Sequence, residues 1–95
     1  MAHYRTKPLV VEAFQMTKEA REMNVKWPHW LHVAWNRYIT DLGALYPLSS
    51  SDLVITTSGG VLVVAVDDWI ILGVKGELYP CKPDIFTETY ELISD

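Results

Sequence analysis

The second half of the chain consists of short apolar runs that turn residues interrupt at close intervals. Leu53–Thr56 and Val61–Val66 are rich in β-branched residues, and Ser58-Gly59-Gly60 separates them. Such runs are typical of strands, and glycines supply the positive φ of a tight hairpin turn. The next predicted turns and strands are Asp67-Asp68, Trp69–Val74, Lys75-Gly76 and Glu77–Tyr79. The segment therefore predicts three successive hairpins that form an antiparallel meander.

Strand-like segments also stand near both ends of the chain. Leu9–Gln15 is apolar and β-branched, and it follows Pro8, whose missing N–H is harmless at the first position of a strand. Tyr90–Ile93 is a shorter segment of the same kind. Between the meander and this last segment, Pro80 and Pro83 are expected to prevent regular strand pairing.

Three connecting segments carry local signals. Thr17 is expected to cap a short helical turn that continues through Asn24, with Glu19 placed favourably near its start. Asp84 is expected to cap a single helical turn over residues 85–89. Tyr46–Asp52 (YPLSSSD) reads as a polar connection.

The middle of the chain contains one strongly amphipathic helix pattern. Apolar side chains recur at i, i+3, i+4, i+7, i+8 and i+11, which places them on one stripe of an α-helix. They are Trp27, Trp30, Leu31, Ala34, Trp35 and Tyr38. Pro28 suits the first helical position, and His29, His32, Asn36 and Arg37 occupy the other side. Of the stripe, Trp27 and Tyr38 lie at its ends and could project beyond the sheet.

These elements together predict an α+β fold. We expect a curved antiparallel sheet of about five strands whose apolar face is covered by the tryptophan-rich helix. No repeat, linker or second unit is visible, so residues 1–95 are expected to form a single domain. A chain of this length buries only about 60–65% of the surface that its unfolded form exposes, so self-association would add stability and a homo-oligomer is expected.

Composition and charge exclude some classes of function. The chain is 49% hydrophobic and 21% charged, which is a globular composition. Its net charge of −4 argues against nonspecific binding to nucleic acid. Residues 1–40 carry six basic and three acidic groups (+3), and residues 41–95 carry two basic and nine acidic groups (−7). Either the two halves pack against each other, or the basic half faces an anionic ligand.

The sequence also favours a cytoplasmic location. It has one cysteine, which cannot form an internal disulfide. The first residues, MAHYRTK, are not followed by the apolar region of a signal peptide. The longest apolar run, Val61–Val66, is about a third of what a membrane-spanning helix requires, so no membrane partner is expected.

Three segments carry a family resemblance. Tyr4–Gln15 reads YRTKPLVVEAFQ, Asp68–Phe86 reads DWIILGVKGELYPCKPDIF, and Thr89-Tyr90-Glu91 follows. They resemble a family of small phage and prophage proteins with the pattern YRKKPVVVEAFQW, then PGDWIIxGVxGExYPCKPDIF, then TYE. Residues 17–65 match only in layout, and Val66-Asp67 stands where the family has Pro-Gly. The resemblance implies a phage-encoded accessory protein and assigns no catalytic residue.

The loop from Gly73 to Phe86 is the first candidate for a binding site. Two glycines and two prolines give it a rigid path, but a turn does not require the particular polar side chains that it carries. Aromatic rings can stack on a nucleobase, and basic side chains can bind its phosphate. The candidate ligand-binding residues are Arg5, Lys7, Trp69, Glu77, Tyr79 and Lys82.

Signals for catalysis or for a cofactor are weak. Cys81 would need a base such as His29 or His32 beside it to act as a nucleophile, and a half-buried thiol explains it more simply. The two histidines have no third metal ligand at helical spacing, and Glu12 and Glu77 have no spacing that pairs them for glycosidase chemistry. We therefore expect neither an enzyme nor a cofactor.

The leading hypothesis is a phage accessory protein that acts by binding. Capture of a small nucleotide-like immune signal, in a pocket between subunits, would make it a counter-defence sponge; this rests on analogy with other small phage proteins. The alternative is an inhibitor or adaptor that binds a host protein, with its acidic half against a basic surface. A minor virion component is a third hypothesis, and hydrolysis of a nucleotide a fourth.

Overall fold

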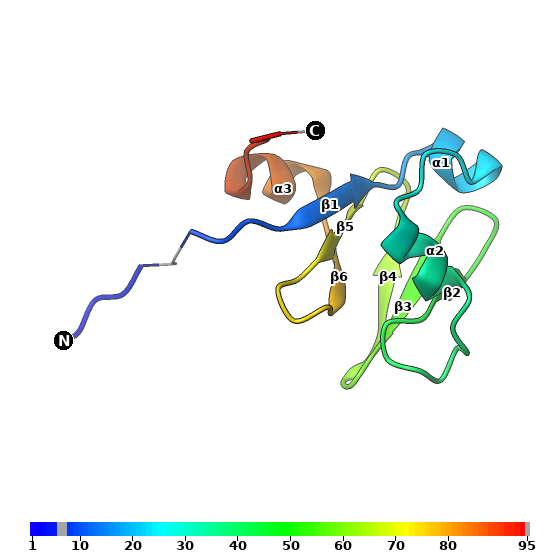
Figure 1. Ribbon diagram of the computed structural model, residues 1–95, viewed down its shortest axis with the longest axis horizontal. Coiled ribbons are helices and arrows are strands. Elements are labelled where there is room, and N and C mark those ends of the chain that lie inside the picture. The colour runs from blue at the N-terminus through cyan, green and yellow to red at the C-terminus, as the bar shows by residue number, and fades with distance from the viewer. Residues whose placement is uncertain (6–7, 95) are drawn as a thin grey trace.

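The structure of the protein, a computed structural model, describes residues 1–5 and 8–94. The described chain forms two antiparallel three-stranded sheets and short helices, so the α+β class is confirmed (Figure 1). Sheet A has the order β1-β5-β6 and comprises Glu12–Gln15, Trp69–Leu72 and Leu78–Cys81. Sheet B has the order β2-β3-β4 and comprises Leu45–Pro47, Leu53–Thr57 and Gly60–Val64. The helices are α1 (Lys18–Met23), α2 (His29–Trp35) and α3 (Pro83–Thr89).

The prediction of one curved five-stranded meander is wrong. The strands β4 and β5 are consecutive but belong to different sheets, and β5 pairs with β1 from the other end of the chain. The cause is the turn after β4. Asp67 N donates to Met16 O at 2.8 Å, and Met16 N donates to Asp68 O at 2.9 Å. These bonds direct the chain onto β1 and away from β4.

That turn is built without glycine. Asp68 N donates to Ala65 O at 3.1 Å, and Asp67 has a φ of 74°. Positive φ at the third of four residues is the requirement of a type II turn, whose second residue is often proline. Val66-Asp67 therefore occupies the positions where Pro-Gly is the favoured pair, and Asp67 takes the left-handed conformation that glycine adopts more readily.

Two predictions about proline-containing segments need correction. Residues 45–47 form β2, although the segment from Tyr46 was predicted to be a connection, and Pro80 lies inside β6 opposite Ile70. Both β2 and β6 are edge strands, where a proline can sit with its nitrogen away from the partner strand. The hairpin prediction at Ser58-Gly59-Gly60 is confirmed, with a φ of 124° at Gly60.

The ends of several elements also differ from expectation. The Thr17 cap is confirmed, because its Oγ1 accepts a hydrogen bond from Ala20 N at 3.1 Å. Asp84 is not the cap of α3: Lys82 holds that position, Pro83 begins the helix, and Asp84 lies within the first turn. Residues 90–93 form no strand, and β1 begins only at Glu12.

The tryptophan-rich helix packs on the core largely as predicted. Trp27, Leu31 and Ala34 are buried, and Trp30 and Trp35 pack against the same cluster. Tyr38 is 80% exposed, so its place in the stripe was wrong, because α2 ends at Trp35. The helix begins at His29, with Pro28 as its cap residue. Trp27 precedes the helix and donates from Nε1 to Ala20 O at 2.9 Å, which fixes α1 beside it.

Both sheets contribute to one hydrophobic core. Leu45, Leu53, Ile55 and Val64 come from sheet B, and Ile70 and Leu78 come from sheet A. Side chains alternate along a strand, so Trp69 and Ile71 point to the opposite face of sheet A. There α3 lies against it: Phe86 stacks on Trp69 at 3.9 Å between ring centroids and 6° between planes, and Tyr90 follows at 5.0 Å.

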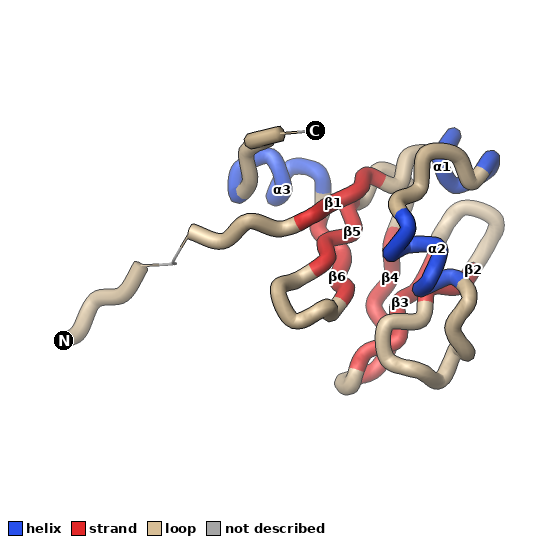
Figure 2. The backbone as a smooth tube through the Cα atoms, in the orientation of Figure 1, coloured by secondary structure: helices blue, strands red, loops and turns tan. Residues whose placement is uncertain are grey.

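The first residues lead away from the two sheets (Figure 1 and Figure 2). Residues 1–5 and 8–10 are exposed and belong to no helix or strand. None of the helices in the described residues has the length and apolar character needed to cross a bilayer.

Candidate functional site

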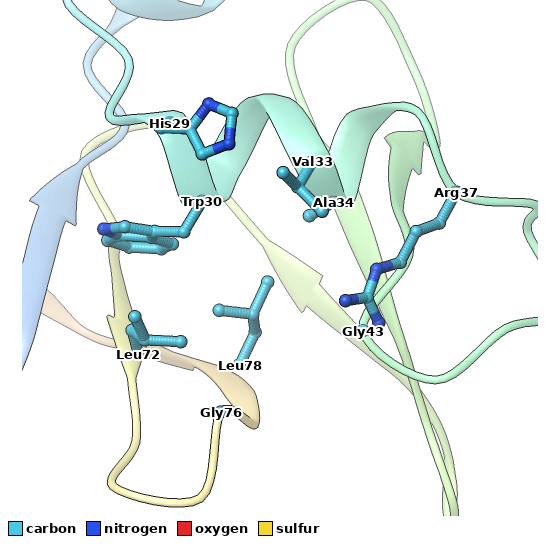
Figure 3. Close-up of a pocket in the computed structure, with 9 residues that line it drawn as sticks. All are labelled: His29, Trp30, Val33, Ala34, Arg37, Gly43, Leu72, Gly76 and Leu78. Atoms are coloured by element: carbon cyan, nitrogen blue, oxygen red, sulfur yellow. The ribbon is translucent and has the colours of Figure 1, made fainter.

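A hollow of about 160 Å³ lies between α2 and the β5–β6 hairpin (Figure 3). One wall is a face of α2 together with the turn that follows it, and the other is the end of β5, the hairpin turn and the start of β6. The lining residues are His29, Trp30, Val33, Ala34, Arg37, Gly43, Leu72, Gly76 and Leu78.

The helix places its lining residues through ordinary helical spacing. Trp30, Ala34 and Arg37 follow one another at intervals of four and three, so they lie above one another along one side. Ala34 is buried and short, which leaves room between its larger neighbours. Arg37 follows the helix, and its N–H donates back to Ala34 O at 3.3 Å, which continues the helical path by one residue.

The guanidinium of Arg37 is held in position by the loop after α2. Its Nη1 donates to Leu42 O at 2.7 Å. Gly43 has a φ of 81°, and a Cβ placed there would come within 3.2 Å of the same nitrogen. A side chain at Gly43 would therefore be strained and would crowd the guanidinium. The remaining N–H groups of this fork can serve a ligand.

The charges around the hollow are of one sign. Arg37 is cationic, and the lining residues include no carboxylate. This is notable in a chain with a net charge of −4. In Figure 3 the Trp30 indole and the Arg37 guanidinium lie on opposite sides of the hollow, with Leu72 and Leu78 along its base.

The size of the hollow sets the size of what it can hold. An apolar cavity of about 150 Å³ accommodates one benzene ring, whereas pockets for drug-sized ligands measure about 300–1,000 Å³. At about 160 Å³, this hollow fits one aromatic ring. Any further part of a ligand would extend from its mouth.

Of the six residues predicted to bind a ligand, the five that the structure describes do not line this hollow. Trp69 and Tyr79 share the outer face of sheet A, where Phe86 covers the indole. Glu77 belongs to the hairpin turn: its Oε2 accepts from Lys75 N at 3.0 Å, and a Cβ at Gly73 would collide with its carboxylate. Arg5 is exposed in the N-terminal segment, and Lys7 lies outside the described residues.

Lys82 is engaged in an ion pair that the sequence did not reveal. Its Nζ lies 3.0 Å from Oδ2 and 3.2 Å from Oδ1 of Asp68, and Ala65 N donates to the same Oδ2 at 2.9 Å. Asp68 is almost fully buried. In the sequence, the sign of this burial was the position of Asp68 directly before an apolar strand, but an aspartate at that position is equally compatible with a turn.

Two ionisable side chains near α3 have raised pKa values. Burial, followed by the neighbouring Tyr90 hydroxyl, raises the pKa of Tyr79 to about 12. Burial, followed by the charges of Asp68 and Asp84, raises the pKa of the Cys81 thiol. A raised thiol pKa disfavours the thiolate, so Cys81 is poorly suited to be a nucleophile.

The two helix histidines have separate surroundings. His29 lines the hollow, whereas His32 lies beside Trp27, with 5.6 Å between ring centroids. Among the residues that the structure describes, no group of three His, Cys, Asp or Glu side chains could hold a metal ion.

Comparison of the chain with protein-family models, with curated proteins and with solved structures found no match. The resemblance to a phage family therefore stays a prediction from the sequence.

Proposed function

We propose that the protein binds a small nucleotide-like anion in the hollow between α2 and the β5–β6 hairpin. The observation that carries the proposal is the pairing of a flat indole, Trp30, with an oriented guanidinium, Arg37, across a space of about 160 Å³. Base–aromatic stacking contributes about 1–3 kcal/mol, and a guanidinium fork matches the geometry of a phosphate.

The size of the space selects the ligand class. A pyrimidine base, which is a single aromatic ring, matches the size of the hollow, and its sugar and phosphate would lie at the mouth near Arg37 and His29. A mononucleotide, linear or cyclic, is therefore preferred over a dinucleotide, unless a second molecule enlarges the site. This site differs from the expected pocket between subunits, because residues of a single chain line the hollow.

The biological setting follows from the resemblance to phage proteins. A phage accessory protein that holds a nucleotide-like immune signal without converting it would lower the free concentration of that signal in the infected cell. The lining groups support holding a ligand: they are aromatic, aliphatic and cationic. Counter-defence by sequestration is the role that we propose on this basis.

The experiment is a titration with AMP, GMP, CMP and their 3′,5′-cyclic forms, with the corresponding nucleosides as charge-free controls. Bound ligand at about 100 times its dissociation constant stabilises the fold by about 2.7 kcal/mol, which raises the melting temperature. Amide NMR shifts should concentrate on residues 29–37 and 72–78. Nucleosides should bind more weakly, because they lack the phosphate.

A matched pair of variants locates the site. Arg37→Gln removes the guanidinium of the hollow and should weaken binding about 10- to 100-fold, as expected for the loss of a charge-assisted hydrogen bond of about 1.5–3 kcal/mol. Arg5→Gln makes the same change in the exposed N-terminal segment and should leave binding unchanged. The proposal fails if no nucleotide shifts the melting temperature, or if the Arg5 variant is the one that loses binding.

A second function, binding to a basic protein surface, is favoured by one observation. Asp84, Glu88 and Glu91 are all exposed on α3 and just after it, and no basic side chain lies in the last turn of this helix. A host partner bound through this surface should be released as the salt concentration rises. Replacement of the three carboxylates by amides should abolish its capture.

A further inference from the structure

A second cavity, of about 230 Å³, lies between α1 and the loop that joins β2 to β3. We call it the α1 cavity. It shares no lining residue with the hollow beside α2. In Figure 1 the loop reaches towards α1 on the side of the molecule away from the N-terminus. The α1 cavity is lined by Lys18, Arg21, Glu22, Ser50, Ser51 and Val66.

The helix α1 presents three charged side chains to this cavity. Lys18, Arg21 and Glu22 lie at i, i+3 and i+4, so they share one side of the helix. Lys18 and Glu22 have the spacing of a helical ion pair, yet neither Lys18 nor Arg21 pairs with a carboxylate of the residues that the structure describes. Both cations are therefore available to an anion from outside the chain.

Arg21 is held in place by aromatic packing. Its guanidinium carbon lies 5.7 Å from the centre of the Trp35 ring, within the range of a cation–π contact. Its Nε is buried and has no hydrogen-bond partner among the described residues. A buried, unpaired N–H on a charged group is costly, and an anion beside the guanidinium offsets part of that cost. The remaining N–H groups of the fork match the geometry of a phosphate.

The opposite wall supplies hydroxyl groups at the tip of an ordered turn. Leu48 N donates to Asp52 O at 2.9 Å, and Ser49 Oγ accepts from Asp52 N at 3.0 Å. These bonds close the turn and place Ser50 and Ser51 at its tip, beside the cavity. Each hydroxyl can donate one hydrogen bond to an oxygen of an anion.

Glu22 distinguishes between anions that carry a proton and anions that do not. A carboxylate repels an ion with acceptor oxygens alone, such as sulfate, but it accepts a hydrogen bond from a P–O–H group. At about pH 6 roughly half of a phosphate monoester still carries a proton, whereas sulfate carries none. The charged lining is therefore better matched to phosphate than to sulfate.

We propose that the α1 cavity binds a phosphate group that carries a proton. Arg21, Lys18 and the two serine hydroxyls donate to its oxygens, and Glu22 accepts its proton in a hydrogen bond. The cavity is larger than the hollow beside α2, which fits one aromatic ring, so a small substituent on the phosphate also fits. The ligand is inorganic phosphate or a small phosphate monoester.

Titration of the full chain with inorganic phosphate, sulfate and glycerol 3-phosphate at about pH 6, followed by amide NMR, tests the proposal. Phosphate should shift the signals of residues 18–22 and 49–52. Sulfate should bind at least about 10-fold more weakly, as expected for the loss of one charge-assisted hydrogen bond. Tighter binding of glycerol 3-phosphate than of inorganic phosphate identifies a monoester as the ligand, and the reverse order identifies free phosphate.

Variants of two exposed residues separate the roles of the lining groups. Glu22→Gln should remove most of the preference by strengthening sulfate binding, because an amide can donate to sulfate. Glu19→Gln makes the same change on α1 outside the cavity and should keep the preference. Lys18→Gln should weaken phosphate binding about 2- to 5-fold, the effect of one exposed charge, whereas Lys75→Gln in the β5–β6 turn should not.

The result is independent of the nucleotide proposal. Arg37→Gln changes the hollow beside α2 and should leave phosphate binding in the α1 cavity unchanged. Three results would overturn the proposal: phosphate that leaves residues 18–22 unshifted, sulfate that binds wild type as tightly as phosphate, or a Glu22→Gln variant that keeps the wild-type preference.

Discussion

The ammonium of Lys82 lies 3.0 Å from a carboxylate oxygen of Asp68, and the two side chains differ sharply in exposure, at 59% and 3%. The pair joins the residue before β5 to the residue before α3. A buried carboxylate is costly unless it is paired, so the exposed lysine keeps the buried aspartate compatible with folding.

Lys82→Met should lower the free energy of unfolding by about 1–3 kcal/mol, because the Asp68 carboxylate would keep only the Ala65 N–H as a partner among the residues that the structure describes. The loss is below the 3–5 kcal/mol of a fully buried pair, since the lysine is largely solvated. Urea denaturation measures it. Lys75→Met, in the exposed hairpin turn, is the control and should change stability by no more than about 0.5 kcal/mol. Equal effects would show that the ion pair contributes nothing.

The turn at Val66-Asp67 leaves room for stabilisation. Asp67 has a φ of 74°, so Asp67→Gly should relieve backbone strain and raise the free energy of unfolding by about 0.5–1 kcal/mol. For a domain of this size that corresponds to about 2–8 °C in melting temperature. Asp67→Asn, which tolerates the same conformation, should change little. A lower melting temperature for the glycine variant would contradict the turn described for this chain.

The stack of Phe86 on Trp69 should be what holds α3 to sheet A, because α3 contains no fully buried residue. Phe86→Ala should destabilise the protein by about 1–3 kcal/mol, combining the stack with partial burial. Amide exchange over residues 83–89 should accelerate, and Cys81 should be alkylated faster. Ile85→Ala, an exposed change in the same helix, serves as control. If the variant accelerates amide exchange only outside residues 83–89, the stack does not hold α3 to sheet A.

Tyr79 predicts a loss of stability at alkaline pH. Burial and Tyr90 raise its pKa from 10.0 to about 12 in the folded protein. Between these values the folded state holds a proton that the unfolded state releases, so stability is complete below pH 10 and declines as the pH rises towards 12. Melting temperatures from pH 9 to 12 should fall more steeply for wild type than for Tyr79→Phe. Parallel curves would exclude a contribution from this hydroxyl.

Local patterns predicted the elements better than their arrangement. Thr17 as a cap, the Ser58-Gly59-Gly60 hairpin and the buried face of α2 all depend on neighbours within a few residues, and these were right. The pairing of β1 with β5 depends on backbone bonds between Met16 and the turn at Asp67, which no local pattern encodes. The local sequence patterns were therefore compatible both with one sheet and with two.

The candidate site was harder to predict, for the same reason. His29 and Arg37 were predicted to lie on the side of the helix opposite the apolar stripe. Arg37 lines the hollow because the loop that returns through Gly43 holds its guanidinium there. Conversely, the polar residues of the Gly73–Phe86 loop looked free to bind, but Lys82 and Glu77 satisfy groups of their own chain.

The separation of the two sheets sets an order for folding on the ribosome. The strands of sheet B follow one another closely in the sequence. In sheet A, β1 pairs with β5, and this pairing places Glu12 opposite Leu72. At synthesis rates of about 5–20 residues per second, β5 is synthesised on the order of seconds after β1. During that interval its apolar side chains are without a sheet, so this strand is where a nascent chain would first need a chaperone.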